Sequence, residues 1–101
     1  MHYEINNGGE SLQATLSEKI TFSDHDIFRE MISTMLNDQT AQQVIDLSAV
    51  DFIDSAGLGM LLLARDEISK TNKTLVLKAP QGQVKRMFDV ARFDTMFTIE
   101  H

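Results

Sequence analysis

A short aliphatic run near the middle of the chain, Val44-Ile45-Asp46-Leu47, lies between two segments with helical periodicity. Such a nearly continuous apolar run is typical of a central strand. Ser23 or Asp24 can cap the helix before it, because a short side-chain oxygen satisfies free backbone N–H groups. A strand between two amphipathic helices predicts an α/β fold. The apolar face of the first helix comprises Ile27, Phe28, Met31, Ile32, Met35 and Leu36.

The residues before the first helix predict a β-hairpin. Apolar and polar residues alternate over 12–16, the period of a half-buried strand. A shorter strand over 3–5 precedes it, and Asn6-Asn7-Gly8-Gly9 supplies the turn. We expect the second strand to run on through Ile20 and Phe22.

The second half of the chain alternates helices and strands. A helix is expected from Ser55 to about Thr71, a strand over 74–77, a helix after Pro80 and a last strand over 97–99. The order β-β-α-β-α-β-α-β predicts one domain, 1–101, with a mixed β-sheet, helices packed on it and right-handed parallel crossovers. The expected inward residues of the last two helices are Leu58, Leu61, Leu62 and Ile68, then Val84, Met87, Phe88 and Ala91.

Composition narrows the function classes. The chain has 101 residues and a net charge of -6, which argues against nucleic acid, since binding it requires a basic surface. There is no cysteine, so disulfides are excluded. The N-terminus lacks an apolar signal core, and the longest apolar run, 60–64, is too short to span a bilayer. We expect a cytoplasmic protein without direct membrane insertion.

The segment 46–59 is the candidate functional region. We expect the strand to end, the chain to turn through acidic residues, and a helix to open with Asp54 or Ser55 as its cap. Gly57 and Gly59 in the first turns cost about 1 kcal/mol each in helix propensity. Close approach of another molecule is one reason for such a cost. Partners commonly meet open α/β sheets beyond the carboxyl ends of the strands.

The same segment, Asp-Leu-Ser-x-Val-x-Phe-Ile-Asp-Ser-x-Gly-Leu-Gly, resembles the signature of STAS domains of the bacterial anti-sigma-factor antagonist family. Residues Val84 to Asp89 resemble the family's final helix, and element order and length agree over nearly the whole chain. The resemblance implies that Ser55 is phosphorylated by a partner that is both serine kinase and anti-sigma factor. It implies that the unphosphorylated form binds this partner and frees a sigma factor, and that a protein serine phosphatase resets the phosphorylated form.

Since the sequence shows no nucleophile–base pair or further polar cluster, we expect no catalytic activity. We also expect no cofactor, and a monomer when the domain is free. The family's frequent Gly-Glu-Leu-Asp before the first helix falls on Glu18-Lys19-Ile20-Thr21, so its Asp is absent here. This departure leaves the partner's identity open. Met60 is expected to lie outward beside Ser55. The expected partner-binding residues are Thr21, Phe22, Asp54, Ser55, Ala56, Gly57 and Met60.

Charge makes a switch at Ser55 plausible without the family. A phosphate adds about -1.5 to -2 charges. A helix N-terminus tolerates an anion, so the fold should survive. Because Asp51, expected in a solvated loop, and Asp54 lie nearby, a docked surface would meet concentrated negative charge.

Other interpretations remain open. Ser55 is a plain helix cap in the simplest of them. A phospho-Asp receiver would use Asp46 at the end of a central strand, but no acidic pair follows the first strand to hold magnesium. A STAS docking subunit of a membrane transporter complex would have the same fold and much the same surface. His2, His25 and His101 have no metal-ligand spacing, so no metal site is predicted.

Overall fold

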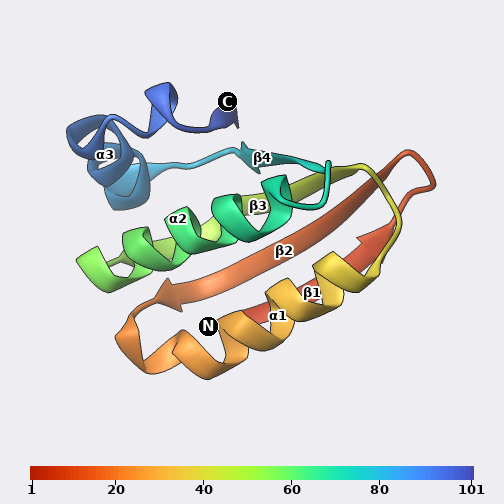
Figure 1. The fold of residues 1–101 in the computed structure, drawn as a ribbon. Helices are drawn as coiled ribbons and strands as arrows, with labels where there is room; N and C mark the ends of the chain where they lie inside the picture. Colours follow the sequence, from red (N-terminus) through yellow and green to blue (C-terminus); the bar gives the residue numbers. More distant parts are fainter.

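Five strands form one mixed sheet in the order β1-β2-β3-β4-β5, and α1 and α2 lie side by side on one of its faces (Figure 1). The computed structural model describes residues 1–101. β1 is antiparallel to β2, and every later pair is parallel. The predicted element order is confirmed. The elements are β1 (His2–Asn7), β2 (Ser11–Ile20), α1 (His25–Asn37), β3 (Gln42–Ile53), α2 (Ser55–Ser69), β4 (Thr74–Lys78), α3 (Gly82–Ala91) and β5 (Thr98–Glu100), with 3-10 turns at Phe22–Asp24 and Phe93–Thr95.

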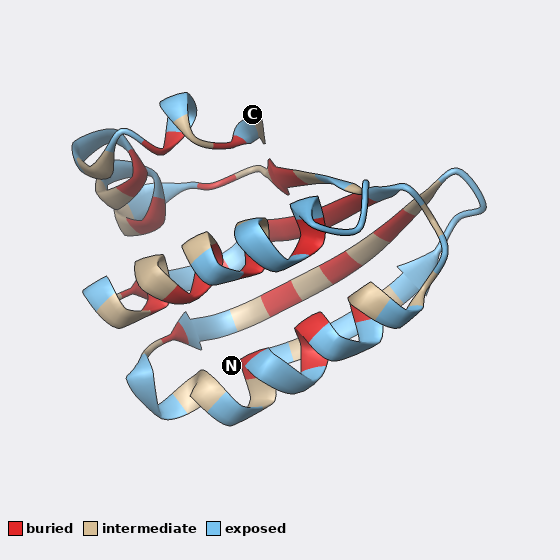
Figure 2. Cartoon of the chain, in the orientation of Figure 1, coloured by how far each residue is buried: buried red, intermediate tan, exposed pale blue.

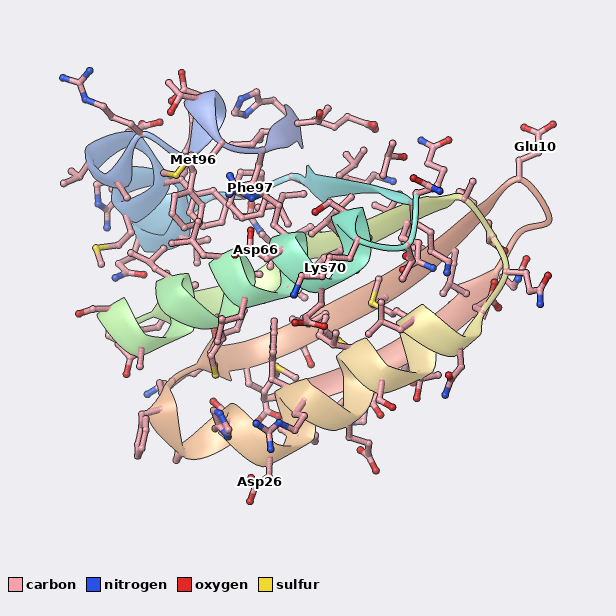
Figure 3. All side chains as sticks on the ribbon, viewed as in Figure 1. Glu10, Asp26, Asp66, Lys70, Met96 and Phe97 are labelled. Atoms are coloured by element: carbon pink, nitrogen blue, oxygen red, sulfur yellow. The ribbon has the colours of Figure 1, made fainter.

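The core lies between the sheet and the helices. In β2 the alternate residues Leu12, Ala14 and Leu16 are fully buried, which confirms the predicted period of two. The predicted face of α1 is also confirmed, although Ile27 and Leu36 are only half-buried. Figure 2 shows α1 and α2 with buried residues toward the sheet and exposed residues on the outside. Figure 3 shows Asp26 of α1 extending away from the sheet into solvent.

The buried face of α2 is rotated from the predicted one. Leu61 and Ile68 are fully buried as expected, but Leu58 and Leu62 are only half-buried. Met60 is 5% exposed, so its expected outward position is wrong. The buried residues of α2 recur at helical spacing from a glycine in the first turn, and this face packs on the sheet in place of the predicted one. The residues of this face are Gly57, Met60, Leu61, Ala64 and Ile68.

β3 is much longer than the predicted run of four residues. β4 pairs with it only as far as Asp46, whereas β2 accompanies it to Ile53. Asp46 therefore lies within a strand, not at its end, and Asp51 lies on the strand, not in a solvated loop. β2 itself ends at Ile20 and does not continue through Phe22, which begins a 3-10 turn.

α3 and the 3-10 turn that follows it add buried side chains to the core beside β3. α3 begins at Gly82, two residues after Pro80, and buries Val84 and Phe88, while Met87 and Ala91 are half-buried. The Phe93 ring lies 4.8 Å from the Phe88 ring and 4.9 Å from the Phe97 ring, between ring centroids.

The last segment of the chain contacts α2 at Arg65, whose guanidinium lies 5.8 Å from the centroid of the Phe97 ring. There the Arg65 guanidinium donates to the Met96 carbonyl at 3.1 Å and joins this segment to the helix. None of the helices combines the length and the apolar character needed to cross a bilayer.

Candidate functional site

Three elements meet at the end of the sheet where β2 and β3 terminate. Figure 1 shows the tip of β2, the 3-10 turn that follows it and the first turn of α2 gathered at one end of the molecule. In the parallel pair β2–β3, Ile20 lies opposite Ile53, so the residues that follow the two strands become neighbours. This is the carboxyl edge at which open α/β sheets usually bind ligands and partners.

Asp54 caps α2 and joins it to the β2 end. Its Oδ1 accepts a hydrogen bond from the Gly57 backbone N–H at 2.7 Å, and its Oδ2 accepts one from the Phe22 N–H at 3.3 Å. The Asp54 N–H donates to the Ile20 carbonyl at 3.2 Å. Of the two caps that the sequence left open, Asp54 is the one used.

Ser55 is the first residue of α2 and is exposed. Since Asp54 supplies the cap, the Ser55 hydroxyl is not needed to satisfy the helix end. Figure 2 shows the beginning of α2 exposed, with buried residues only from the later part of its first turn. The hydroxyl is therefore accessible to another protein at a helix N-terminus, where backbone N–H groups and the helix dipole favour an anion.

Gly57 is required by contacts within the chain. A Cβ atom added there would lie 2.5 Å from the Ile20 carbonyl oxygen and 2.6 Å from Cγ1 of Ile53. Close approach by another molecule is thus not needed to explain this glycine. Gly59 differs, because a Cβ atom there would meet nothing within 4 Å.

The turn after β2 is held by the carboxylate of Asp24. Its Oδ2 accepts from the Thr21 N–H at 2.8 Å, and its Oδ1 accepts from the Met1 amino group at 2.7 Å. Burial acts to raise the pKa of Asp24, but the hydrogen bonds from the Met1 amine and from Thr21 outweigh it and lower the pKa. Asp24 occupies the N-cap position of α1, but its side chain makes no capping hydrogen bond there, because it points back to Thr21 instead.

Two phenylalanines are exposed at this end of the molecule. Phe22 is 74% exposed and Phe52 is 39% exposed, which is unusual for side chains of this size. The exposure of Phe52 was not predicted from the sequence. A regular strand would bury only one of Phe52 and Ile53, but which one depends on the irregular pairing of β2 with β3, and that pairing is not visible in the sequence. The acidic residues Glu18 and Asp51 are exposed on the same strand ends.

The structure brings together four of the predicted partner-binding residues. Thr21 and Phe22 lie beside Asp54 and Ser55 through the hydrogen bond from Phe22 to Asp54. Ala56, in the first turn of α2, is half-buried, and Gly57 is buried against Ile20 and Ile53.

Met60 is not part of this surface. It lies between α1 and α2 and lines a groove of about 350 Å³ together with Phe28 and Ile32. No group of three His, Cys, Asp or Glu side chains is arranged to hold a metal ion.

Comparison with known proteins defines the class. The family described as Mlab, STAS domain, matches residues 4–99. The chain therefore belongs to the STAS-domain family, and the resemblance drawn from the segment 46–59 is confirmed. A STAS-domain containing protein of Pseudomonas aeruginosa (strain UCBPP-PA14) is 28% identical over 91 residues, which span 90% of this chain and 89% of that protein.

Solved structures share the fold at low identity. An anti-sigma factor antagonist from Mycobacterium paratuberculosis has a TM-score of 0.87 and 21% identity, over 98% of this chain and 84% of that one. The phosphorylated form of the Bacillus cell fate determinant SpoIIAA has a TM-score of 0.72 and 16% identity, over 99% and 92%. A sulfate transporter family protein from Wolinella succinogenes has a TM-score of 0.77 and 12% identity, over 92% and 79%. At these identities the likeness is one of fold.

Proposed function

We propose that this STAS domain is an anti-sigma-factor antagonist that works by partner switching in the cytoplasm. The unphosphorylated form binds an anti-sigma factor with serine kinase activity and so frees a sigma factor for transcription. Phosphorylation of Ser55 by that partner releases the complex, and a protein serine phosphatase restores the binding form. The domain itself performs no catalysis.

The observation that carries the proposal is that Asp54 and Ser55 have different roles at the start of α2. Asp54 caps α2, and the neighbouring Ser55 hydroxyl stands exposed at the helix N-terminus. A phosphate on Ser55 would keep the cap intact and be favoured by the helix dipole. The fold of the domain would then survive modification, as a reversible switch requires.

Electrostatics supports release on phosphorylation. Asp54 and the exposed Asp51 lie close to Ser55 in the chain, and a phosphate adds about -1.5 to -2 charges. Moving a complex from almost fully bound to almost fully free takes roughly 5.5 kcal/mol of differential affinity. Like charges brought together at an interface cost several kcal/mol. One phosphate on this surface is therefore of the right order.

The same surface indicates the chemistry of the partner. Phe22 is the most exposed aromatic side chain beside Ser55, and exposed aromatic residues are enriched among the dominant contacts of interfaces. Glu18 and Asp51 are exposed near the ends of β2 and β3. A partner surface with an apolar pocket for Phe22 and basic residues at its rim would complement both features. The fold likeness to an antagonist from Mycobacterium paratuberculosis and to a phosphorylated Bacillus protein agrees with this role.

The test is a titration of the anti-sigma factor kinase against four forms of the protein at matched salt. These are the wild type, Ser55→Ala, Ser55→Asp and the Ser55 phosphoprotein. Ser55→Ala should bind as tightly as the wild type, Ser55→Asp more weakly and the phosphoprotein most weakly. Ser69→Asp adds a charge at the other end of α2 and should leave the affinity unchanged. Equal affinity of the phosphoprotein and Ser55→Ala would show that no switch exists.

A second candidate function is a STAS docking subunit of a membrane transporter complex. The fold likeness to a sulfate transporter family protein from Wolinella succinogenes favours it. Docking would use the same exposed surface around Phe22. In the same titration, this function predicts binding to a transporter subunit that does not change when Ser55 is phosphorylated.

A further inference from the structure

The last part of β3 lacks a strand on the side that faces away from β2. β4 pairs with β3 only up to the register Asp46↔Lys78 and then leaves the sheet through Ala79, whose φ is 55°, and Pro80. β3 continues for seven more residues, 47–53. Backbone N–H and C=O groups in a partly buried strand need hydrogen-bond partners. These groups require a substitute for the missing strand.

Two glutamines at the start of α3 provide part of that substitute. The Gln81 side-chain amide donates to the Ser48 carbonyl. The Gln83 Oε1 accepts from the Ile53 N–H at 2.9 Å, and the Gln83 Nε2 donates to the Ile53 carbonyl at 2.9 Å. One side-chain amide thus satisfies both backbone groups of one residue, as the backbone of a neighbouring strand would.

Ile53 is the last residue of β3 and lies directly before the cap of α2. It immediately precedes Asp54, whose N–H is bonded to the Ile20 carbonyl on the β2 side. Its Cγ1 lies where a side chain on Gly57 would have to go. The backbone that leads to Ser55 is therefore held from both sides, by Ile20 of β2 and by Gln83 of α3.

We propose that Gln83 is a positioning residue for Ser55. By fixing both backbone groups of Ile53 it sets the direction in which the chain enters the Asp54 cap, and so the orientation in which the Ser55 hydroxyl is presented. This inference rests on the proposed function of Ser55. It makes α3 part of the switch, although the Gln83 amide reaches only the backbone of Ile53 and not Ser55 itself. Residues 53 and 83 are far apart in the sequence, and no motif links them.

The test compares three variants of the full chain. Gln83→Leu removes both hydrogen bonds while keeping a side chain of similar size. Gln83→Glu keeps the acceptor for the Ile53 N–H but has no donor for the Ile53 carbonyl at neutral pH. Gln81→Leu is the matched control, because it removes a glutamine bond from the same strand edge at Ser48, five residues before Ile53.

The first readout needs no partner. Amide hydrogen exchange at Ile53 and Gly57 should speed up about thirtyfold in Gln83→Leu, the size expected from losing two hydrogen bonds. Gln83→Glu should give a smaller increase, and Gln81→Leu should leave the Gly57 amide unchanged. The second readout is kcat/KM for phosphorylation of Ser55, which should fall in the same order while circular dichroism stays that of the wild type.

The outcomes separate the two proposals. Unchanged exchange at Gly57 in both Gln83 variants would overturn the positioning role. Faster exchange with unchanged kcat/KM would also overturn it, since the turn would then move without consequence for Ser55. A wild-type chain that is protected at Gly57 but never phosphorylated at Ser55 would overturn the switching function itself, whatever the variants do.

Discussion

The first turn of α2 lies directly against the backbone of β2 at Gly57 and Ile20. A Cβ atom on Gly57 would come within 2.5 Å of the Ile20 carbonyl oxygen. The carbonyl also accepts the Asp54 N–H, so strand end and helix start are joined by a hydrogen bond and by close contact. This approach is what brings Ser55 beside Phe22.

Gly57→Ala should therefore destabilise the fold. The added methyl group would force the strand end and the helix apart, and overpacking of this kind typically costs about 1–3 kcal/mol, more than the roughly 1 kcal/mol gained in helix propensity. Gly59→Ala is the matched control, because its methyl group meets open space and should stabilise by up to about 1 kcal/mol. Urea denaturation of both variants measures the difference. Equal effects of the two substitutions would contradict the close contact.

Asp54→Ala should lose about 0.5–2 kcal/mol of stability, the usual cost of an N-cap. It should also free the Phe22 N–H, so the turn after β2 should become more mobile than in the wild type. Asp51→Ala removes the same charge from the exposed face of β3 and should change the free energy of unfolding by less than about 0.5 kcal/mol. Thermal melts and amide exchange at Phe22 provide the measurements. A loss in Asp51→Ala as large as in Asp54→Ala would argue against the cap.

Glu18→Gly should be neutral or stabilising. Glu18 has a φ of 72° at a register shift between β2 and β3, and the left-handed region costs a residue with a side chain roughly 1–2 kcal/mol. Glu18→Val should be destabilising, because a β-branched residue tolerates positive φ least. If the valine variant were as stable as the glycine variant in urea, the bulge would not have this conformation.

Leu61→Ala should cost about 2–5 kcal/mol, since Leu61 is fully buried in the core. Leu63 is two residues further along the same helix but 61% exposed, so Leu63→Ala should change stability by less than about 0.5 kcal/mol. Denaturant melts of this pair test the phase of α2. The reverse order of effects would mean that the helix packs on its other face.

Stability should fall at low pH through Asp24. Its pKa in the folded protein is lowered, so its carboxylate stabilises the fold above the unfolded pKa, near 4, and this contribution is lost as the pH falls through the folded value. Asp24→Asn should therefore be less stable than the wild type at pH 7, and the gap should narrow below about pH 4. Urea melts of both proteins from pH 7 to pH 3 give the comparison. A gap that stays constant with pH would assign the stabilisation to something other than the charge of Asp24.

The order of the elements and the site motif could be predicted from the sequence, because both are local. Alternation over 12–16 and the apolar stripe of α1 are set by residues a few positions apart, and backbone geometry turns such spacing directly into a strand or a helix face. The strand–turn–helix segment that contains Ser55 is likewise continuous in the chain. The glycines of this segment indicated that something approaches the helix start closely, but the sequence did not show that the contact is with β2 and β3.

Only the tertiary structure decided what those local features contact. The choice of Asp54 over Ser55 as cap, the length of β3 and the exposure of Phe52 depend on how β2, with its bulge at Glu18, pairs with β3. The burial of Met60 depends on how α1 packs beside α2. The Gln83–Ile53 pair joins residues thirty positions apart. Such contacts follow from which unsatisfied backbone groups and apolar surfaces meet after the chain has collapsed, and that depends on the whole fold at once.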